Sequence, residues 1–163
     1  MFRVELIDKA IALLAAFREQ GLKLATAESC TGGLIAALIT EISGSSDVYE
    51  RGFVTYSNEA KTELIGVDAG LIALHGAVSA EVARAMAEGS LRFSRCDIAV
   101  AVTGIAGPGG GSMSKPVGLV HLATARRGGV TVDQACRFGD IGRQSVRLAA
   151  VDVALDMLLD ALA

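Results

Sequence analysis

The segment DIAVAV, residues 97–102, constrains the fold more than any other stretch of the chain. A nearly continuous apolar run of this length is typical of a strand covered on both faces by helices. Residues 22–27 form a second apolar segment of the same kind, and helical periodicity runs through residues 4–20, 31–42 and 143–162. The sequence therefore predicts an α/β protein with a three-layer α/β/α architecture.

The remaining strands predict a mixed, mostly parallel central sheet. GFVTYS lies in a strand within residues 48–57, and residues 117–126 and 130–138 flank a Gly-Gly turn at 128–129. Helix-joined strands run parallel, whereas a tight hairpin joins antiparallel ones. The 163 residues contain no repeat or linker, so we expect a single domain over residues 1–163.

Several helix ends carry recognisable signals. Gly21 predicts the end of the first helix, while Asp68 and Ser79 predict the starts of two others. The helix that Asp68 begins is expected to end at residues 75–76. Asn58 is expected to cap a helix that runs to about residue 65, which places Lys61 at its third position.

Composition argues against several partners. The net charge of −3, without a basic stripe, gives no reason to expect nucleic acid. No apolar run reaches the length of a membrane span, and Glu5, Asp8 and Lys9 interrupt the N-terminal apolar segment, so no membrane partner or signal peptide is expected. We expect a cytoplasmic protein.

The cysteines are few and widely spaced. Cys30, Cys96 and Cys136 form no CxxC or Cys/His metal pattern, so neither disulfides nor a metal site is predicted. Cys96 and Cys136 are most simply small apolar core residues.

The first chemical constellation is AESCTGG, residues 27–33, where a strand passes into a helix. Ser29 or Cys30 at such a turn lies near backbone N–H groups that lack helical partners and favour negative charge. Gly32 would let a substrate approach the backbone closely. The alternative is that Ser29 or Thr31 only caps the helix.

The second constellation is FVTYSNEAK, residues 53–61. Near the positive end of a helix dipole, and more so if buried, Lys61 would have a lowered pKa and could accept a proton from a serine. Tyr56 at the strand end would lie near the same amine. The alternative is that Lys61 points into water.

The third constellation is TGIAGPGGG, residues 103–111. Its glycines predict a loop whose amides wrap an anion, although it matches neither a Walker nor a Rossmann pattern. A surface turn is the alternative. Neither His75 nor His121 lies beside a serine at a turn, so serine–lysine chemistry is favoured. A Ser-His-Asp triad remains an alternative, because triad residues can be distant in sequence.

Together these segments resemble the CinA C-terminal domain family, the nicotinamide-nucleotide amidases. The resemblance covers nearly the whole chain and is carried by AESCTGG, GFVTYSNEAK, TGIAGPGGG with KPVG, and FGDIGRQSVRLAA at residues 138–150. It implies hydrolysis of the carboxamide of nicotinamide mononucleotide to nicotinate mononucleotide and ammonia, without metal or organic cofactor.

The resemblance also assigns residues. It implies Ser29 as nucleophile, Lys61 as base and Tyr56 as the residue that orients the lysine or relays a proton, with Cys30 as the rival nucleophile. The backbone around Cys30, Thr31 and Gly32 would hold the oxyanion and contact substrate. The residues expected to face the substrate from the third constellation are Thr103, Gly104, Gly107, Gly109 and Gly110.

Arg143 is the candidate for the substrate phosphate, with Arg147 as second choice. Many relatives carry this domain behind a larger module, whereas here the sequence starts with the first helix, so we expect the stand-alone form. We expect it to act on a small nucleotide as a homo-oligomer. An alternative function is that of a nucleotide-binding or regulatory domain, which binds a nucleotide in the same pocket without hydrolysing it. A weaker alternative is a structural subunit of a larger assembly.

Overall fold

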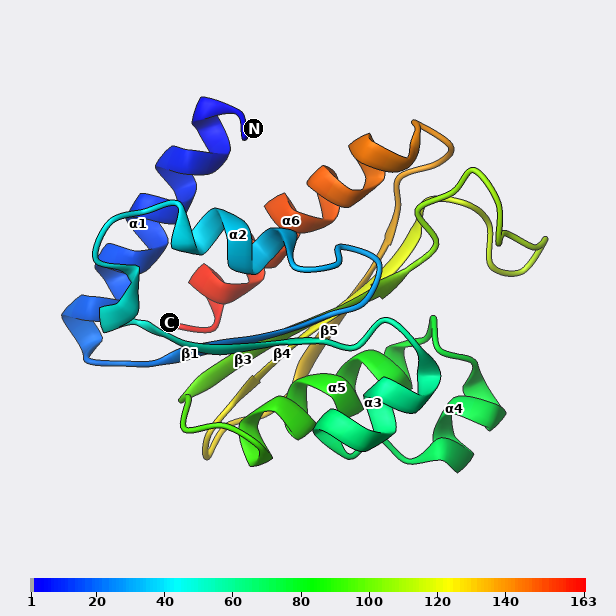
Figure 1. Cartoon of the computed structure of the whole chain (residues 1–163), viewed down its shortest axis with the longest axis horizontal. Helices are drawn as coiled ribbons and strands as arrows, with labels where there is room; N and C mark the ends of the chain where they lie inside the picture. The colour runs from blue at the N-terminus through cyan, green and yellow to red at the C-terminus, as the bar shows by residue number, and fades with distance from the viewer. Residues whose placement is uncertain (1) are drawn as a thin grey trace.

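The computed structural model describes residues 2–163 and places a five-stranded sheet between two layers of helices (Figure 1). The strands are β1 (Leu24–Glu28), β2 (Tyr49–Val54), β3 (Ile98–Gly104), β4 (Leu119–Arg126) and β5 (Val132–Arg137). The helices are α1 (Val4–Gln20), α2 (Leu34–Thr40), α3 (Asn58–Ile65), α4 (Ala69–His75), α5 (Ala80–Arg92) and α6 (Arg143–Asp160), with a short 3₁₀ turn, η1 (Ser45–Asp47).

The sheet has the strand order β2-β1-β3-β4-β5. β1 pairs in parallel with both β2 and β3, whereas β4 is antiparallel to β3 and to β5. Only β4 therefore runs against the other strands, which confirms the mixed, mostly parallel sheet.

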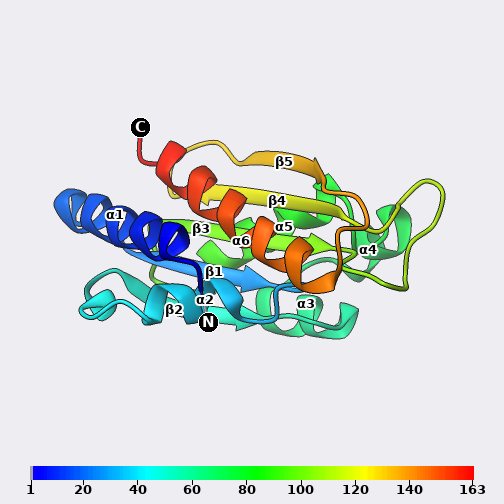
Figure 2. The same ribbon diagram turned by 90° about the horizontal axis from the view of Figure 1, so that it is seen from above.

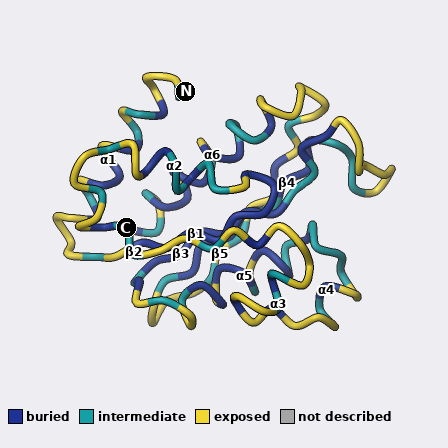
Figure 3. The backbone as a smooth tube through the Cα atoms, viewed as in Figure 1, coloured by how far each residue is buried: buried dark blue, intermediate teal, exposed yellow. Residues whose placement is uncertain are grey.

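Helices cover both faces of this sheet, as the two ribbon views show (Figures 1 and 2). α1, α2 and α6 lie on one face and α3, α4 and α5 on the other. All of β1 and the first six residues of β3 are buried (Figure 3). Alternate residues of β3 serve the two layers, since Val100 shares a core with Phe17 of α1 while Ala101 shares one with Met86 of α5.

Most predicted boundaries are confirmed. Gly21 follows α1 in the left-handed conformation, with φ of 67°. The side chains of Asp68 and Ser79 accept hydrogen bonds from the N–H groups of Gly70 and Val82, as N-caps do. Within residues 2–163, none of the helices combines the length and hydrophobicity needed to cross a membrane.

The start of α3 corrects a prediction. Its N-cap is Ser57, whose hydroxyl accepts a hydrogen bond from the Ala60 N–H at 3.0 Å, and Asn58 is already the first helical residue. Serine and asparagine cap equally well, so the sequence alone could not choose between neighbours. Lys61 is consequently the fourth helical residue, not the third.

Candidate active site

The three sequence constellations meet where β1, β2 and β3 end, at the same edge of the sheet. This is the edge at which sites form in open α/β sheets. A cavity of about 210 Å³ lies there. The predicted residues that line it are Ser29, Cys30, Tyr56, Lys61, Thr103, Gly104 and Arg143.

The centre of the cavity is a contact between Ser29 and Lys61. The Lys61 Nζ lies 3.1 Å from the Ser29 Oγ, although the two residues are 32 positions apart. Ser29 is 9% exposed and Lys61 only 1%. The amine is therefore buried and in hydrogen-bond reach of a hydroxyl, and the alternative in which Lys61 points into water is wrong.

The surroundings of the Lys61 amine are carbonyl oxygens. Nζ also donates to the backbone oxygen of Thr55 at 2.9 Å and lies 3.5 Å from that of Ser57. None of the ion pairs among residues 2–163 includes Lys61. Burial lowers the pKa of Lys61, and the nearby Cys30 and Glu59 oppose that effect. Burial therefore replaces the helix dipole as the main cause of the lowered pKa.

Cys30, the rival nucleophile, is poorly suited to the task. Burial raises the pKa of its thiol to about 11, and a hydrogen bond with its own backbone and the charge of Arg147 offset only part of this. A thiol that keeps its proton at neutral pH is a weak nucleophile. The geometry therefore favours Ser29.

The turn after β1 differs from its prediction. α2 begins at Leu34, not at Thr31, because the buried carboxylate of Glu28 takes the amides that begin the helix. It accepts hydrogen bonds of 2.9–3.1 Å from the N–H groups of Gly33, Ile35 and Ala36. Thr31 is buried and its hydroxyl has no hydrogen-bond partner within residues 2–163, so the reading of Ser29 or Thr31 as caps is wrong.

Tyr56 lines the cavity together with Lys61 and is mostly exposed. It is 60% exposed, and its hydroxyl accepts a hydrogen bond from Arg143 Nη2 at 3.0 Å. Arg143 Nη1 donates to the Gly107 oxygen at 2.9 Å. No hydrogen bond within residues 2–163 joins Tyr56 to Lys61, so the structure gives the predicted lysine-orienting role no contact.

The glycine loop meets the cavity only at its first residues. The Thr103 hydroxyl donates to the Ala77 oxygen at 2.9 Å. A Cβ on Gly104 would lie 2.7 Å from Val120 Cγ2, so this position needs glycine for the packing of β3 on β4. Gly109 and Gly110 are exposed on a loop that extends from the sheet in Figure 1, and neither they nor Gly107 line the cavity.

Some residues of the site gave no usable sequence signal. Asn58, Ala77, Val78 and Ala106 complete the cavity lining. Small apolar residues in loops carry no chemical pattern, and Asn58 was interpreted only as a cap. Glu28 did offer a signal, since an acid just before a helix suits the helix dipole.

Comparison with known proteins gives a consistent result. A family model described as the CinA C-terminal domain matches residues 7–162. The chain is 55% identical over 152 residues to a CinA-like protein of Geobacter sulfurreducens and 52% identical over 155 residues to one of Akkermansia muciniphila. These matches cover 93% and 95% of this chain but 36% and 37% of the relatives, so the chain spans little more than a third of their length.

Solved structures match over their whole length. The crystal structure of the competence/damage inducible protein CihA from Agrobacterium tumefaciens has a TM-score of 0.96 and 54% identity, covering 99% of this chain and 98% of that one. A CinA superfamily protein from Klebsiella pneumoniae has a TM-score of 0.91 and 36% identity, covering 96% and 97%. The α/β/α architecture is therefore that of the CinA superfamily structures.

Proposed function

The chain belongs to the CinA C-terminal domain family, and from that premise we propose that it is a nicotinamide-nucleotide amidase. The reaction is hydrolysis of the carboxamide of nicotinamide mononucleotide to nicotinate mononucleotide and ammonia. The observation that carries the proposal is the 3.1 Å contact between the buried Lys61 amine and the Ser29 hydroxyl. A nucleophile within hydrogen-bond reach of a base is the arrangement that covalent amide hydrolysis needs.

In the first half-reaction, neutral Lys61 accepts the Ser29 proton as Oγ bonds to the amide carbon. When the amine is neutral, its two N–H groups can be donated to the Thr55 and Ser57 oxygens, so its lone pair is left for the proton of Ser29. When the carbon–nitrogen bond of the tetrahedral intermediate breaks, the proton on Lys61 passes to the leaving ammonia. The product is an acyl-serine.

In the second half-reaction, water attacks the acyl-serine. Lys61 takes the proton from the water, and returns it to Ser29 Oγ as the ester bond breaks. Nicotinate mononucleotide leaves, and both residues regain their starting protonation. The lowered pKa of Lys61 supports this cycle, because a base works best when its pKa approaches the ambient pH.

The substrate phosphate is assigned to Arg143 at the cavity mouth. A guanidinium has five N–H donors, and those of Arg143 that do not bond Tyr56 or Gly107 are free for an anion. A cavity of about 210 Å³ suits the carboxamide and its ring, with the phosphate outside near Arg143. Tyr56 then acts with Arg143 at the mouth instead of with Lys61.

The experiment is ammonia release by the purified chain from nicotinamide mononucleotide. We expect ammonia and nicotinate mononucleotide in equal amounts, measured by a coupled ammonia assay and by mass spectrometry. Free nicotinamide, which lacks the phosphate, is the comparison substrate and is expected to react far more slowly. Binding of the mononucleotide without turnover would instead favour the nucleotide-binding domain.

Replacing Cys30 separates the two candidate nucleophiles. We expect Cys30→Ala to keep at least about a third of kcat, because the buried thiol stays protonated at neutral pH. The measurement is steady-state amidase kinetics, with thermal unfolding to confirm that the variant is folded. A folded Cys30→Ala protein without activity would assign the nucleophile to Cys30.

A further inference from the structure

Arg147 of α6 reaches back to the turn that follows Ser29. Its Nε donates to the Cys30 oxygen at 3.1 Å and its Nη2 to the Thr31 oxygen at 3.0 Å. Resting on the amidase function proposed above, we propose that Arg147 is a positioning residue: it holds these two peptide groups so that the Cys30 and Thr31 N–H groups form the oxyanion-binding site. Arg147 is thus 118 residues from Ser29 in the sequence.

The peptide planes of the turn set the directions of its N–H groups. The peptide bonds from Ser29 to Gly32 are trans, so each C=O points opposite to the N–H of the next residue. The Ser29 oxygen accepts from the Gly32 N–H at 3.0 Å, which fixes the direction of the Cys30 N–H. The Cys30 oxygen is held by Arg147, which fixes the direction of the Thr31 N–H.

The second Arg147 contact completes this set. By holding the Thr31 oxygen, Arg147 turns the Gly32 N–H toward the Ser29 oxygen. Gly32 has φ of 58°, and a Cβ there would lie 3.5 Å from Arg147 Nη2. The left-handed φ therefore favours glycine here, and the guanidinium lies at ordinary contact distance from this position.

Two N–H groups of this turn remain free. No hydrogen bond to another residue within residues 2–163 uses the N–H of Cys30 or Thr31. The Glu28 carboxylate has already taken the amides of Gly33, Ile35 and Ala36 at the start of α2. The free donors nearest to Ser29 are thus those that Arg147 and the Ser29 oxygen orient.

The direction of these donors follows from the layers of the fold. α6 lies on one face of the sheet and α3, which carries Lys61, on the other (Figure 1). The Cys30 N–H is directed opposite to the Ser29 carbonyl, which the Gly32 N–H holds. Because Arg147 draws the Cys30 carbonyl toward α6, the Thr31 N–H on the opposite side of that peptide is directed away from α6. On that side the cavity lies against Ser29, Cys30 and Lys61.

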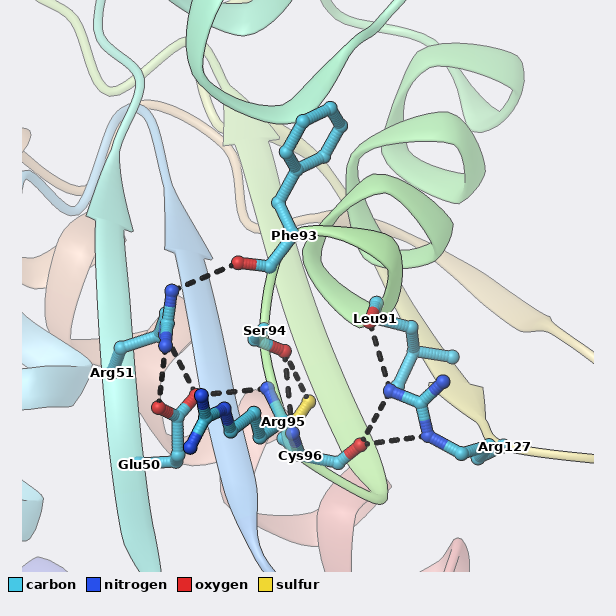
Figure 4. Close-up of polar contacts among 8 residues, drawn as sticks. All are labelled: Glu50, Arg51, Leu91, Phe93, Ser94, Arg95, Cys96 and Arg127. Atoms are coloured by element: carbon cyan, nitrogen blue, oxygen red, sulfur yellow. Dashed lines mark hydrogen bonds and ion pairs between the residues drawn. The ribbon is translucent and has the colours of Figure 1, made fainter.

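Arg127 offers a matched control at the other end of the sheet. Its Nε and Nη2 donate to the Cys96 oxygen at 3.1 and 2.9 Å, and its Nη2 also to the Leu91 oxygen at 2.9 Å (Figure 4). Like Arg147, it holds two backbone carbonyls, here those of Leu91 in the last turn of α5 and of Cys96 before β3. Cys96 precedes β3, whereas the cavity lies where β3 ends, so Arg127 is remote from the site.

The experiment compares Arg147→Ala, Arg147→Lys and Arg127→Ala in the amidase assay. We expect Arg147→Ala to lower kcat by about 10²–10³-fold, as loss of an oxyanion donor does, with KM little changed. Arg147→Lys keeps one donor and should retain an intermediate kcat. Arg127→Ala should lower Tm to a similar degree while its kcat stays within about twofold of the parent.

Rescue of activity by added guanidinium distinguishes a positioning role of Arg147 from a merely structural one. A surface cavity of about 350 Å³, lined in part by Arg147, Gln144 and Leu148, gives the ion access to the vacated position. Guanidinium at millimolar concentration is expected to raise kcat of Arg147→Ala at least tenfold. This is a partial recovery of the about 10²–10³-fold that one oxyanion donor contributes. It should leave Arg127→Ala unchanged.

A second probe separates this inference from the choice of substrate. Diisopropyl fluorophosphate phosphorylates an activated serine as the oxygen–phosphorus bond forms and fluoride leaves, and its phosphoryl oxygen needs the same donors. We expect Ser29 to be labelled rapidly in the parent and in Arg127→Ala, and slowly in Arg147→Ala, by intact-protein mass spectrometry.

The outcomes are distinct. Labelling of Ser29 in this order without ammonia release would reject the proposed substrate and support the role of Arg147. Equal labelling of the parent and Arg147→Ala would overturn that role, as would a change in KM alone or a failure of guanidinium to rescue. Ammonia release that is unaffected by Arg147→Ala would leave the amidase function intact and reject this inference.

Discussion

Ser29→Ala is expected to lower kcat for nicotinamide mononucleotide hydrolysis by about 10⁴–10⁶-fold, the loss typical when a catalytic serine is removed. The acyl-serine cannot form without the hydroxyl, and the adjacent Cys30 thiol does not replace it because burial raises its pKa to about 11. Substrate binding should change little, since the hydroxyl is one small group among those that line the cavity. Steady-state ammonia release and calorimetric titration with the mononucleotide measure the two effects.

The control for this variant is Ser94→Ala. Ser94 precedes β3, at the opposite end of the sheet from the cavity, where its hydroxyl contacts Cys96. We expect parental kcat for Ser94→Ala in the same assay. A folded Ser29→Ala protein that retained a tenth or more of the activity would remove Ser29 as nucleophile.

Lys61→Met is expected to lower kcat by about 10²–10⁴-fold, the usual contribution of a general base. Methionine fills similar space with an unbranched chain, so the cavity wall is preserved while the amine is lost. Only the Ser29, Thr55 and Ser57 oxygens lose a partner. Lys23→Met, at the start of β1, is the control and should keep its activity.

The same variant has an expected effect on stability. Because the folded-state pKa of Lys61 lies below its ordinary value of 10.5, the unfolded chain binds more protons between the two values. The free energy of unfolding therefore rises with pH through this window, and below it the buried amine costs stability. We expect Lys61→Met to be at least as resistant as the parent to denaturant at neutral pH.

Chemical denaturation of the two proteins at neutral and at alkaline pH tests this. The advantage of Lys61→Met should shrink as pH rises toward 10.5 and level off above it, where the amine is neutral in both states. A Lys61→Met protein of parental activity would reject the base, and one destabilised equally at every pH would reject the lowered pKa.

The sequence predicted helices and strands well where a single local pattern determines the element or its end. The apolar run ending in Val102 specified a strand buried on both faces, and Gly21 specified the end of α1. α2 was placed too early because the pattern from Thr31 onward is apolar and helical. What decides its start is the Glu28 carboxylate, whose contact with the amides appears only once the turn has folded.

The part of the site that follows from the sheet topology could be predicted from the sequence. Ser29 and Lys61 follow neighbouring parallel strands, and the ends of such strands meet at one edge of the sheet. The hydrogen bond between Tyr56 and Arg143 spans 87 positions and has no local pattern, so the sequence did not predict it. The sequence offered Arg147 only as the second choice for the phosphate, since an internal partner for an arginine cannot be inferred from spacing.

Titration of the Lys61 amine tests the central claim most directly. Lysine labelled with ¹³C next to the amine, assigned through Lys61→Met, reports its protonation by NMR as pH is raised. We predict a midpoint below 10.5 that coincides with the rising limb of kcat/KM, because only the neutral amine activates Ser29. An amine that titrates at 10.5 or above, in an enzyme fully active at neutral pH, would contradict the account.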